Sequence, residues 1–175
     1  MGFADVDPEV RAQCAGLVDR LAAEGTEVVE VDSIFPSDPI EPWIVLWVVA
    51  RHKAQGHLIG TPDFDRLSDS IKPQIIKGSR VSALEHARAL DEMYRLNALV
   101  EDAFDTTGAS LLLSPTAATH PPPLDELGID PEADVGWVRF TYGINMTRHP
   151  AGTVPTGLNA AGLPVALQVV GRHHG

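Results

Sequence analysis

Histidine is the side chain of this sequence with the widest chemical reach, because it can bind metals and transfer protons near neutral pH. The chain holds seven histidines. A functional zinc site needs three or four ligands at workable spacing, usually supported by further hydrogen bonds. The sequence contains no His-Glu-x-x-His or Cys/His arrangement, and the pair His173-His174 is typical of adventitious binding. We therefore predict no functional metal site. The other histidines are scattered: His52, His57, His86, His120 and His149.

A serine, a histidine and an acid also lie close enough in sequence to propose a hydrolytic triad. These residues are Ser114, His120 and Asp125. A triad is defined by geometry, however, and no nucleophile-elbow sequence surrounds Ser114. The favoured interpretation is that Ser114 and Thr116 cap the end of a strand in a loop stiffened by proline.

The first third of the chain predicts a helix followed by a strand. Asp7 is the expected N-cap, Pro8 suits the first helical position, and Gly25 has the usual place after a helix end. Residues 26–31 alternate in polarity and are predicted as a strand. A second helix is expected from Glu41-Pro42 to about Lys53. Its tryptophans, Trp43 and Trp47, are interpreted as core aromatics, with a stacking platform for a ligand as the alternative.

Later elements are marked by caps and apolar runs. Ser82 to Glu85 forms a capping box, and the long helix it opens should end before Gly108. The apolar run 109–113 is predicted as a strand buried on both faces. Residues 114–127 should form a proline-rich loop. A short helix is expected within 137–146.

The stretch from Asn145 to Arg172 has the most informative pattern. Two apolar runs, 151–155 and 164–170, are separated by turn residues and predict two strands with a glycine-bearing connection. Ten positions of this stretch also match, in register, a known family signature, which reads Asn-x-x-Gly-x-Pro-Ala, Pro-x-Gly and Gly-Leu-Pro-x-Gly-x-Gln-x-x-Gly. They are Asn145, Pro150, Ala151, Pro155, Gly157, Gly162, Leu163, Pro164, Gln168 and Gly171. On these residues the sequence resembles the amidase-signature hydrolases, although Arg148 and Ala166 stand where that family usually has glycine.

The resemblance extends over nearly the whole chain, through residues 2–10, 111–116 and 121–123. It implies an α/β fold: the C-terminal part of an α/β/α domain with a mixed β-sheet flanked by helices, so that residues 1–175 form a single incomplete domain. It also implies hydrolysis of carboxamide C–N bonds by a Ser–Ser–Lys centre in a Gly-Ser-rich stretch. The sequence contains no such stretch. We therefore expect no catalytic residue in this chain and no activity of the chain alone.

The resemblance assigns one possible site to this chain. In the family, the loop after the buried strand and the segment before the Asn-x-x-Gly motif help to wall the acyl pocket. The candidate substrate-binding residues are Thr116, Trp137, Phe140 and Tyr142. The role expected for Asn145 is to fasten the following turn. The alternative function is a non-catalytic binding or interaction module built on the same scaffold.

Composition narrows the partners and the compartment. The net charge of −11 disfavours nucleic acid, and no apolar run is long enough to cross a membrane. Glycine motifs for nucleotides are absent from the sequence, so no cofactor is expected. The single Cys14 in an apolar helical stripe suggests a reducing, cytoplasmic compartment. Strands expected to lack neighbours predict self-association through sheet edges.

Overall fold

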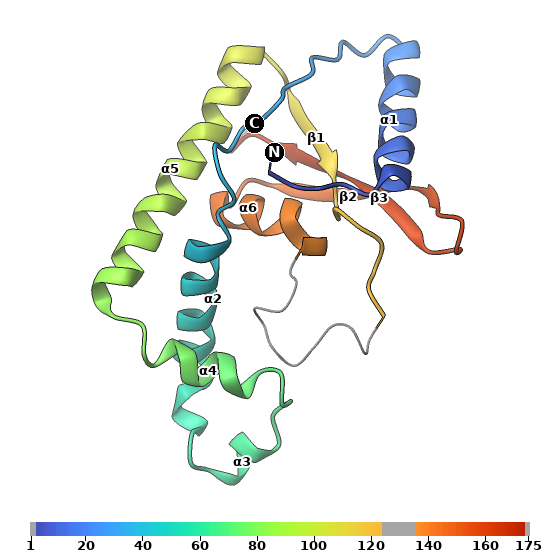
Figure 1. Cartoon of the computed structure of the whole chain (residues 1–175). Coiled ribbons are helices and arrows are strands. Elements are labelled where there is room, and N and C mark those ends of the chain that lie inside the picture. The colour runs from blue at the N-terminus through green and yellow to red at the C-terminus, as the bar shows by residue number, and fades with distance from the viewer. Residues whose placement is uncertain (1–2, 124–135, 174–175) are drawn as a thin grey trace.

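The computed structural model describes residues 3–123 and 136–173. Their helices and strands form layers, with a three-stranded sheet between helices (Figure 1). The elements follow the chain in this order: α1 (Pro8–Ala23), α2 (Ile40–Gln55), η1 (Gly56–Leu58), α3 (Pro62–Asp65), α4 (Lys72–Gly78), α5 (Ala83–Thr107), β1 (Leu111–Pro115), η2 (Gly136–Val138), α6 (Arg139–Thr147), β2 (Ala151–Leu158) and β3 (Pro164–Gly171).

The sheet has the order β1-β3-β2, and both of its pairings are antiparallel. The predicted α/β class is confirmed, and the part of the expected mixed sheet described here consists of antiparallel pairs. The β2–β3 hairpin is also confirmed. A register shift between Pro155 and Gly157 places an irregularity in β2. Because β2 lies at the edge of the sheet, a proline is tolerated at position 155, beside the irregularity.

The two faces of the sheet pack against different helices. Val165 and Leu167 of β3 join Val10 and Cys14 of α1 in one buried cluster. On the other face, Val170 joins a larger cluster with residues of α5 and α6. Side chains in a strand alternate between faces, so neighbouring residues of β3 serve both clusters. The second cluster contains Phe35, Met93, Leu96, Val100, Phe104, Ile144, Met146 and Val170.

The helix signals in the sequence were reliable. The Asp7 side chain accepts hydrogen bonds from the first turn of α1, and both bonds of the Ser82–Glu85 capping box are present. Gly25 and Gly108 have positive φ, at 97° and 67°, where glycine is least strained. Gly78 is the last residue of α4, and Ser79 is its C-cap.

One strand prediction was wrong, and a second was wrong in part. Residues 26–31 form no strand, and Val28, Val29 and Val31 are exposed. Their backbone pairs with none of the three described strands, and an extended segment is not stabilised without a partner.

The strand predicted at 109–113 exists as β1, but it is not buried on both faces. Leu112 packs against the larger cluster, whereas Leu111 and Leu113 are 54% and 38% exposed. The register places these two side chains on the α1 face of the sheet. Since α1 packs on Val165 and Leu167 there, Leu111 and Leu113 stay uncovered.

Candidate functional site

The loop after β1 is held by three elements that are distant in sequence. The Thr116 N–H donates to the Ala166 carbonyl of β3 at 2.9 Å, and the Ala118 N–H donates to the Trp137 carbonyl at 3.0 Å. The Ala118 carbonyl accepts from the Asp7 N–H at 2.9 Å. Ala118 itself is fully buried. The loop therefore has a fixed path between the sheet, the start of α1 and the segment that leads into α6.

This arrangement places the four predicted substrate-binding residues at different depths. Thr116 and Trp137 are half-buried and reach solvent, and the Thr116 hydroxyl lies 3.4 Å from that of Thr153. Phe140 and Tyr142 of α6 are buried, at 4% and 1% exposure. Contact of any of the four with a substrate stays a prediction.

The buried pair has clear internal partners. The Phe140 carbonyl accepts a hydrogen bond from Gln168 Nε2 at 3.2 Å, and the Tyr142 hydroxyl donates to Asp38 Oδ1. Burial raises the pKa of Tyr142, and the Asp38 carboxylate beside it raises the pKa further. Tyr142 is therefore a neutral donor at physiological pH and ties α6 to the start of α2.

The sequence-based triad is not assembled. Ser114 Oγ donates to the Pro115 carbonyl at 3.3 Å and accepts from Gln168 Nε2 at 3.2 Å. His120 Nε2 instead lies 3.4 Å from Asp7 Oδ1 and 3.4 Å from Glu9 Oε2. Asp125 lies outside the described residues. Ser114 and His120 thus have separate partners, in agreement with a structural role for Ser114 at the end of the strand.

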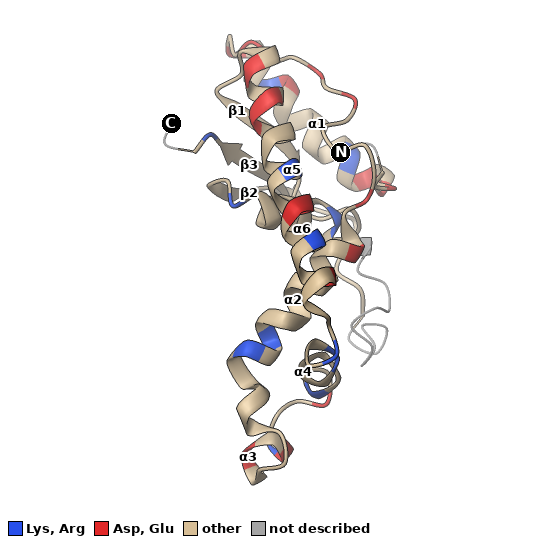
Figure 2. Cartoon of the chain, turned by 90° about the vertical axis from the view of Figure 1, so that its left-hand side faces the viewer, with Lys and Arg blue, Asp and Glu red and all other residues tan. Residues whose placement is uncertain are grey.

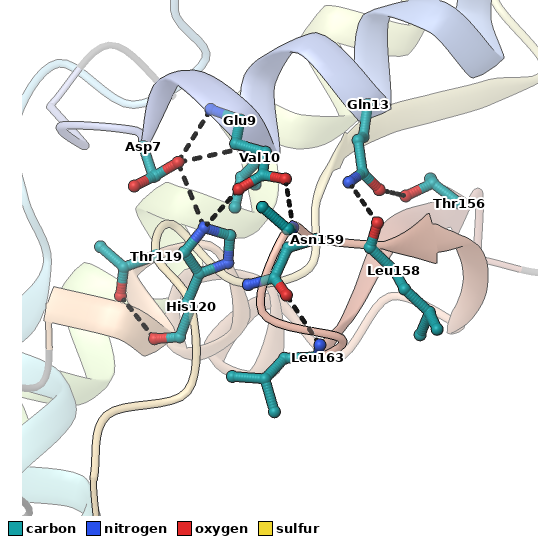
Figure 3. Close-up of polar contacts among 11 residues, drawn as sticks. Asp7, Glu9, Val10, Gln13, Thr119, His120, Thr156, Leu158, Asn159 and Leu163 are labelled. Carbon is teal, nitrogen blue, oxygen red and sulfur yellow. Dashed lines mark hydrogen bonds and ion pairs between the residues drawn. The ribbon is translucent and has the colours of Figure 1, made fainter.

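Instead, His120 belongs to a polar network around the start of α1, which Figure 3 shows. Asp7 faces His120 and caps α1 through Glu9 N at 2.8 Å. Glu9 Oε1 accepts from Ala160 N in the hairpin connection at 2.7 Å. Asn159 Oδ1 closes that connection by accepting from Leu163 N at 2.7 Å. The network clamps α1, the hairpin and the loop together, which is a structural function.

The Trp43 and Trp47 rings both contact other side chains of the protein. The rings of Trp43 and Trp47 stack at 5.3 Å, and Trp43 also lies 5.4 Å from Tyr142. The Arg51 guanidinium covers Trp47 at 4.4 Å, and Trp47 Nε1 donates to Gln74. Trp43 packs against the larger cluster. These contacts agree with the interpretation as core aromatics, with Trp47 at the margin.

Sequence reasoning missed one group that could hold a metal. One ligand atom each from Glu101, His149 and His173 lies within 4.8 Å of the other two. Burial lowers the pKa of His149, an effect opposed by its hydrogen bond to Glu101 and reinforced by the nearby His173. The three residues come from α5, the turn after α6 and the residues after β3. They are too far apart in sequence for a local metal-binding motif to predict the group.

Comparison with known proteins identifies the family. The Amidase family model matches residues 1–175. The chain belongs to the amidase family. It is 27% identical to an acylamidase of Rhodococcus erythropolis over 99% of its own length, and 28% identical to the 2-amino-5-chloromuconic acid deaminase of Comamonas testosteroni over 95%. It spans about 37% of the length of each of these relatives.

Solved structures share the amidase fold. An amidase crystal structure aligns with a TM-score of 0.80 at 23% identity, over 96% of this chain and 39% of that one. The substrate complex of 6-aminohexanoate cyclic dimer hydrolase aligns with a TM-score of 0.78 at 24% identity, over 95% of this chain and 38% of that one. At this level of identity the likeness establishes the fold alone.

The amidase signature residues of this chain have structural roles. Gln168 is buried and joins Ser114 of β1 to the Phe140 carbonyl of α6. Gly162 has φ of 78° in the hairpin connection. Asn145 was expected to fasten the next turn, but it lies on the exposed side of α6. The described turn is held by the Arg148 N–H on the Ile144 carbonyl and by the Thr147 hydroxyl on the same carbonyl.

Proposed function

We propose that this chain is the C-terminal portion of an amidase that hydrolyses carboxamide C–N bonds, and that it supplies scaffold and one wall of the substrate pocket. The observation that carries the proposal is the family match over residues 1–175 in a chain about 37% as long as its relatives. The names of those relatives, an acylamidase among them, support amide chemistry at the level of the family.

The reaction centre of the proposed enzyme lies outside the printed sequence. In the family that the sequence resembles, a serine activated through a second serine and a lysine attacks the amide carbonyl, and water then hydrolyses the acyl-enzyme. Backbone N–H groups of a glycine-rich stretch stabilise the oxyanion. The printed sequence has no Gly-Gly-Ser-Ser-Gly-Gly run, and Ser114, the serine considered for a local triad, lacks a histidine partner.

The pocket wall consists of two accessible residues backed by two buried ones. Thr116 and Trp137 are half-buried, and the hydrogen bond from the Ala118 N–H to the Trp137 carbonyl joins the loop that carries Thr116 to the segment that carries Trp137. Phe140 and Tyr142 are buried, and their hydrogen bonds with Gln168 and Asp38 hold α6 in place. Because these hydrogen bonds fix the proposed wall within the folded chain, we expect the pocket to be pre-formed.

The first experiment tests the chain by itself. The purified chain should not hydrolyse an aryl amide such as an acyl anilide above the buffer rate, because the printed sequence lacks the Gly-Ser-rich stretch that carries the family's nucleophile. Turnover that persists through purification and disappears in Ser114→Ala would contradict the proposal and restore the local triad.

The second experiment adds the missing part. Co-expression with the N-terminal portion of an amidase-family enzyme should give hydrolysis. Trp137→Ala should then raise KM, or lower kcat/KM, whereas Trp47→Ala on α2 should change neither. If a complex forms but no tested amide is hydrolysed, the alternative of a non-catalytic interaction module is favoured.

We also propose the cytoplasm as the compartment. Cys14 is a buried free thiol, and burial raises its pKa, which keeps it unreactive in a reducing environment. No described helix is long and apolar enough to cross a membrane.

A further inference from the structure

Glu101, His149 and His173 form a compact group of potential ligands away from the proposed pocket wall. The His149 and His173 rings lie 4.1 Å apart between centroids, and Glu101 Oε1 lies 3.0 Å from His149 Nε2. The His149 side chain is fully buried, and Glu101 is one-third exposed. Two imidazoles and one carboxylate are a donor set that suits zinc and similar divalent ions.

The hydrogen bonds of Thr147 determine which nitrogen of His149 is available. The Thr147 hydroxyl donates to the Ile144 carbonyl at 2.9 Å and lies 2.9 Å from His149 Nδ1. Its proton is therefore in use, so His149 Nδ1–H is the donor to Thr147 Oγ1. The lone pair of neutral His149 is then on Nε2, which faces the Glu101 carboxylate. A proton on Nε2 gives the hydrogen bond to Glu101 at 3.0 Å, and a divalent metal ion can take the place of that proton.

The Thr147 carbonyl orients the second histidine. His173 Nε2 lies 3.1 Å from that carbonyl, and in the tautomer that donates to the carbonyl the lone pair of His173 is on Nδ1. Asn97 Nδ2 donates to the same oxygen at 2.7 Å. Asn97 Nδ2 also lies 3.1 Å from His173 Nε2, which accepts from it in the other tautomer of His173. Buried Thr147 thus holds both rings, one by its hydroxyl and one by its carbonyl.

We propose that Glu101, His149 and His173 bind one Zn²⁺ ion, with water as the fourth ligand on the solvent side of Glu101. Ligating histidines usually donate their other ring N–H to a fixed acceptor, and Thr147 supplies that acceptor for both. The net charge of −11 favours a bound cation in general. The ion would join α5, the turn after α6 and the end of β3, and so stabilise the fold. This role is separate from amide hydrolysis.

Calorimetry with zinc chloride tests the proposal on the full chain after dialysis against a chelator. The wild type should bind one equivalent. Glu101→Gln keeps the shape but not the charge, and the affinity should fall by more than about 100-fold, whereas Thr147→Val should cost about 10- to 100-fold. The matched control, His57→Ala, removes an exposed histidine outside the group and should bind as the wild type does.

Two results would overturn the site. One is zinc binding that Glu101→Gln leaves unchanged, since this would assign the ion to the adventitious His173-His174 pair. The other is the absence of stoichiometric binding by the wild type. Cobalt(II) substitution checks the geometry without any variant, because a four-coordinate site gives intense visible absorption and a hexahydrated or loosely held ion does not.

Discussion

At the scale of single residues, the Tyr142–Asp38 hydrogen bond is the clearest polar link between α6 and the chain before α2. Tyr142 is 1% exposed and donates to a half-buried carboxylate that also caps Ile40 N at 3.1 Å. A hydrogen bond to a charged group contributes more than a neutral one. Tyr142 therefore stabilises the packing of α6 against the chain before α2, and its removal should affect the whole domain.

Tyr142→Phe should lower the free energy of unfolding by about 1.5–3 kcal/mol, because the hydroxyl is lost while the ring remains. Tyr94→Phe is the matched control: Tyr94 is 66% exposed, and its substitution should leave stability within about 0.5 kcal/mol. Urea titrations of both variants measure the difference. Equal stability of the two variants would show that the Asp38 contact contributes nothing.

The same residue predicts a dependence on pH. The pKa of Tyr142 is raised in the folded state, so the folded protein keeps this proton at a pH where the unfolded chain releases it. Its contribution is present below the unfolded pKa of about 10 and falls as the pH rises above that value. The stability gap between wild type and Tyr142→Phe should consequently narrow in urea titrations above about pH 10.

At the scale of elements, the sequence predicted what is encoded locally. The Ser82 capping box, the Gly108 helix end and the β2–β3 hairpin each depend on residues a few positions apart. Other features depend on which element lies beside which: the exposure of Leu111 and Leu113, the absence of a strand at 26–31, and the grouping of Glu101, His149 and His173. The periodicity of apolar residues in the sequence does not say which elements are neighbours in space. For the same reason the pairing of Ser114 with Gln168, rather than with His120, was not predictable.

Gly78 marks the close approach of α4 to α2. A Cβ at this position would lie 2.0 Å from the Val48 carbonyl oxygen, which is backbone and cannot turn aside. Gly78→Ala should therefore separate the two helices and cost about 1–3 kcal/mol. The contrasting control is Gly16→Ala in the middle of α1, where nothing lies within 4 Å of the new Cβ.

Gly16→Ala should stabilise the protein by roughly 0.5–1 kcal/mol, because alanine favours a helix over glycine. Both variants replace glycine by alanine in a helix, so they share the gain in helix propensity. The difference between their melting temperatures therefore measures the cost of the clash between α4 and α2. If both variants melt higher than the wild type, α2 and α4 have more freedom than their contact implies.

At the scale of the whole molecule, charge and apolar surface are unevenly placed. Acidic positions lie along α1 and α5, as expected from a net charge of −11 (Figure 2). The uncovered part of the sheet is apolar. Leu111, Leu113 and Val154, which we term the sheet patch, share the α1 face by register and are 54%, 38% and 46% exposed.

We propose that the remainder of an amidase-family domain would cover the sheet patch, because this chain spans about 37% of the length of its relatives. Without that remainder, the sheet patch of one chain can be covered by the apolar surface of a second copy. We therefore expect the isolated chain to self-associate at micromolar concentration, as measured by light scattering. Addition of the N-terminal portion of an amidase-family enzyme should dissociate the oligomers.

Substitution can assign this association to the sheet patch. Leu113→Lys places a charge at its centre and should shift the chain toward monomer, since burying an unpaired charge costs far more than the lost apolar contact. Leu84→Lys is the matched control, because Leu84 is 60% exposed on α5 and lies outside the patch. A wild-type chain that stays monomeric and binds no apolar dye would refute the expectation. If Leu113→Lys still forms the same oligomers, the interface between copies lies outside the sheet patch. The sheet patch is supported as the contact surface only if Leu113→Lys loses the association and Leu84→Lys keeps it.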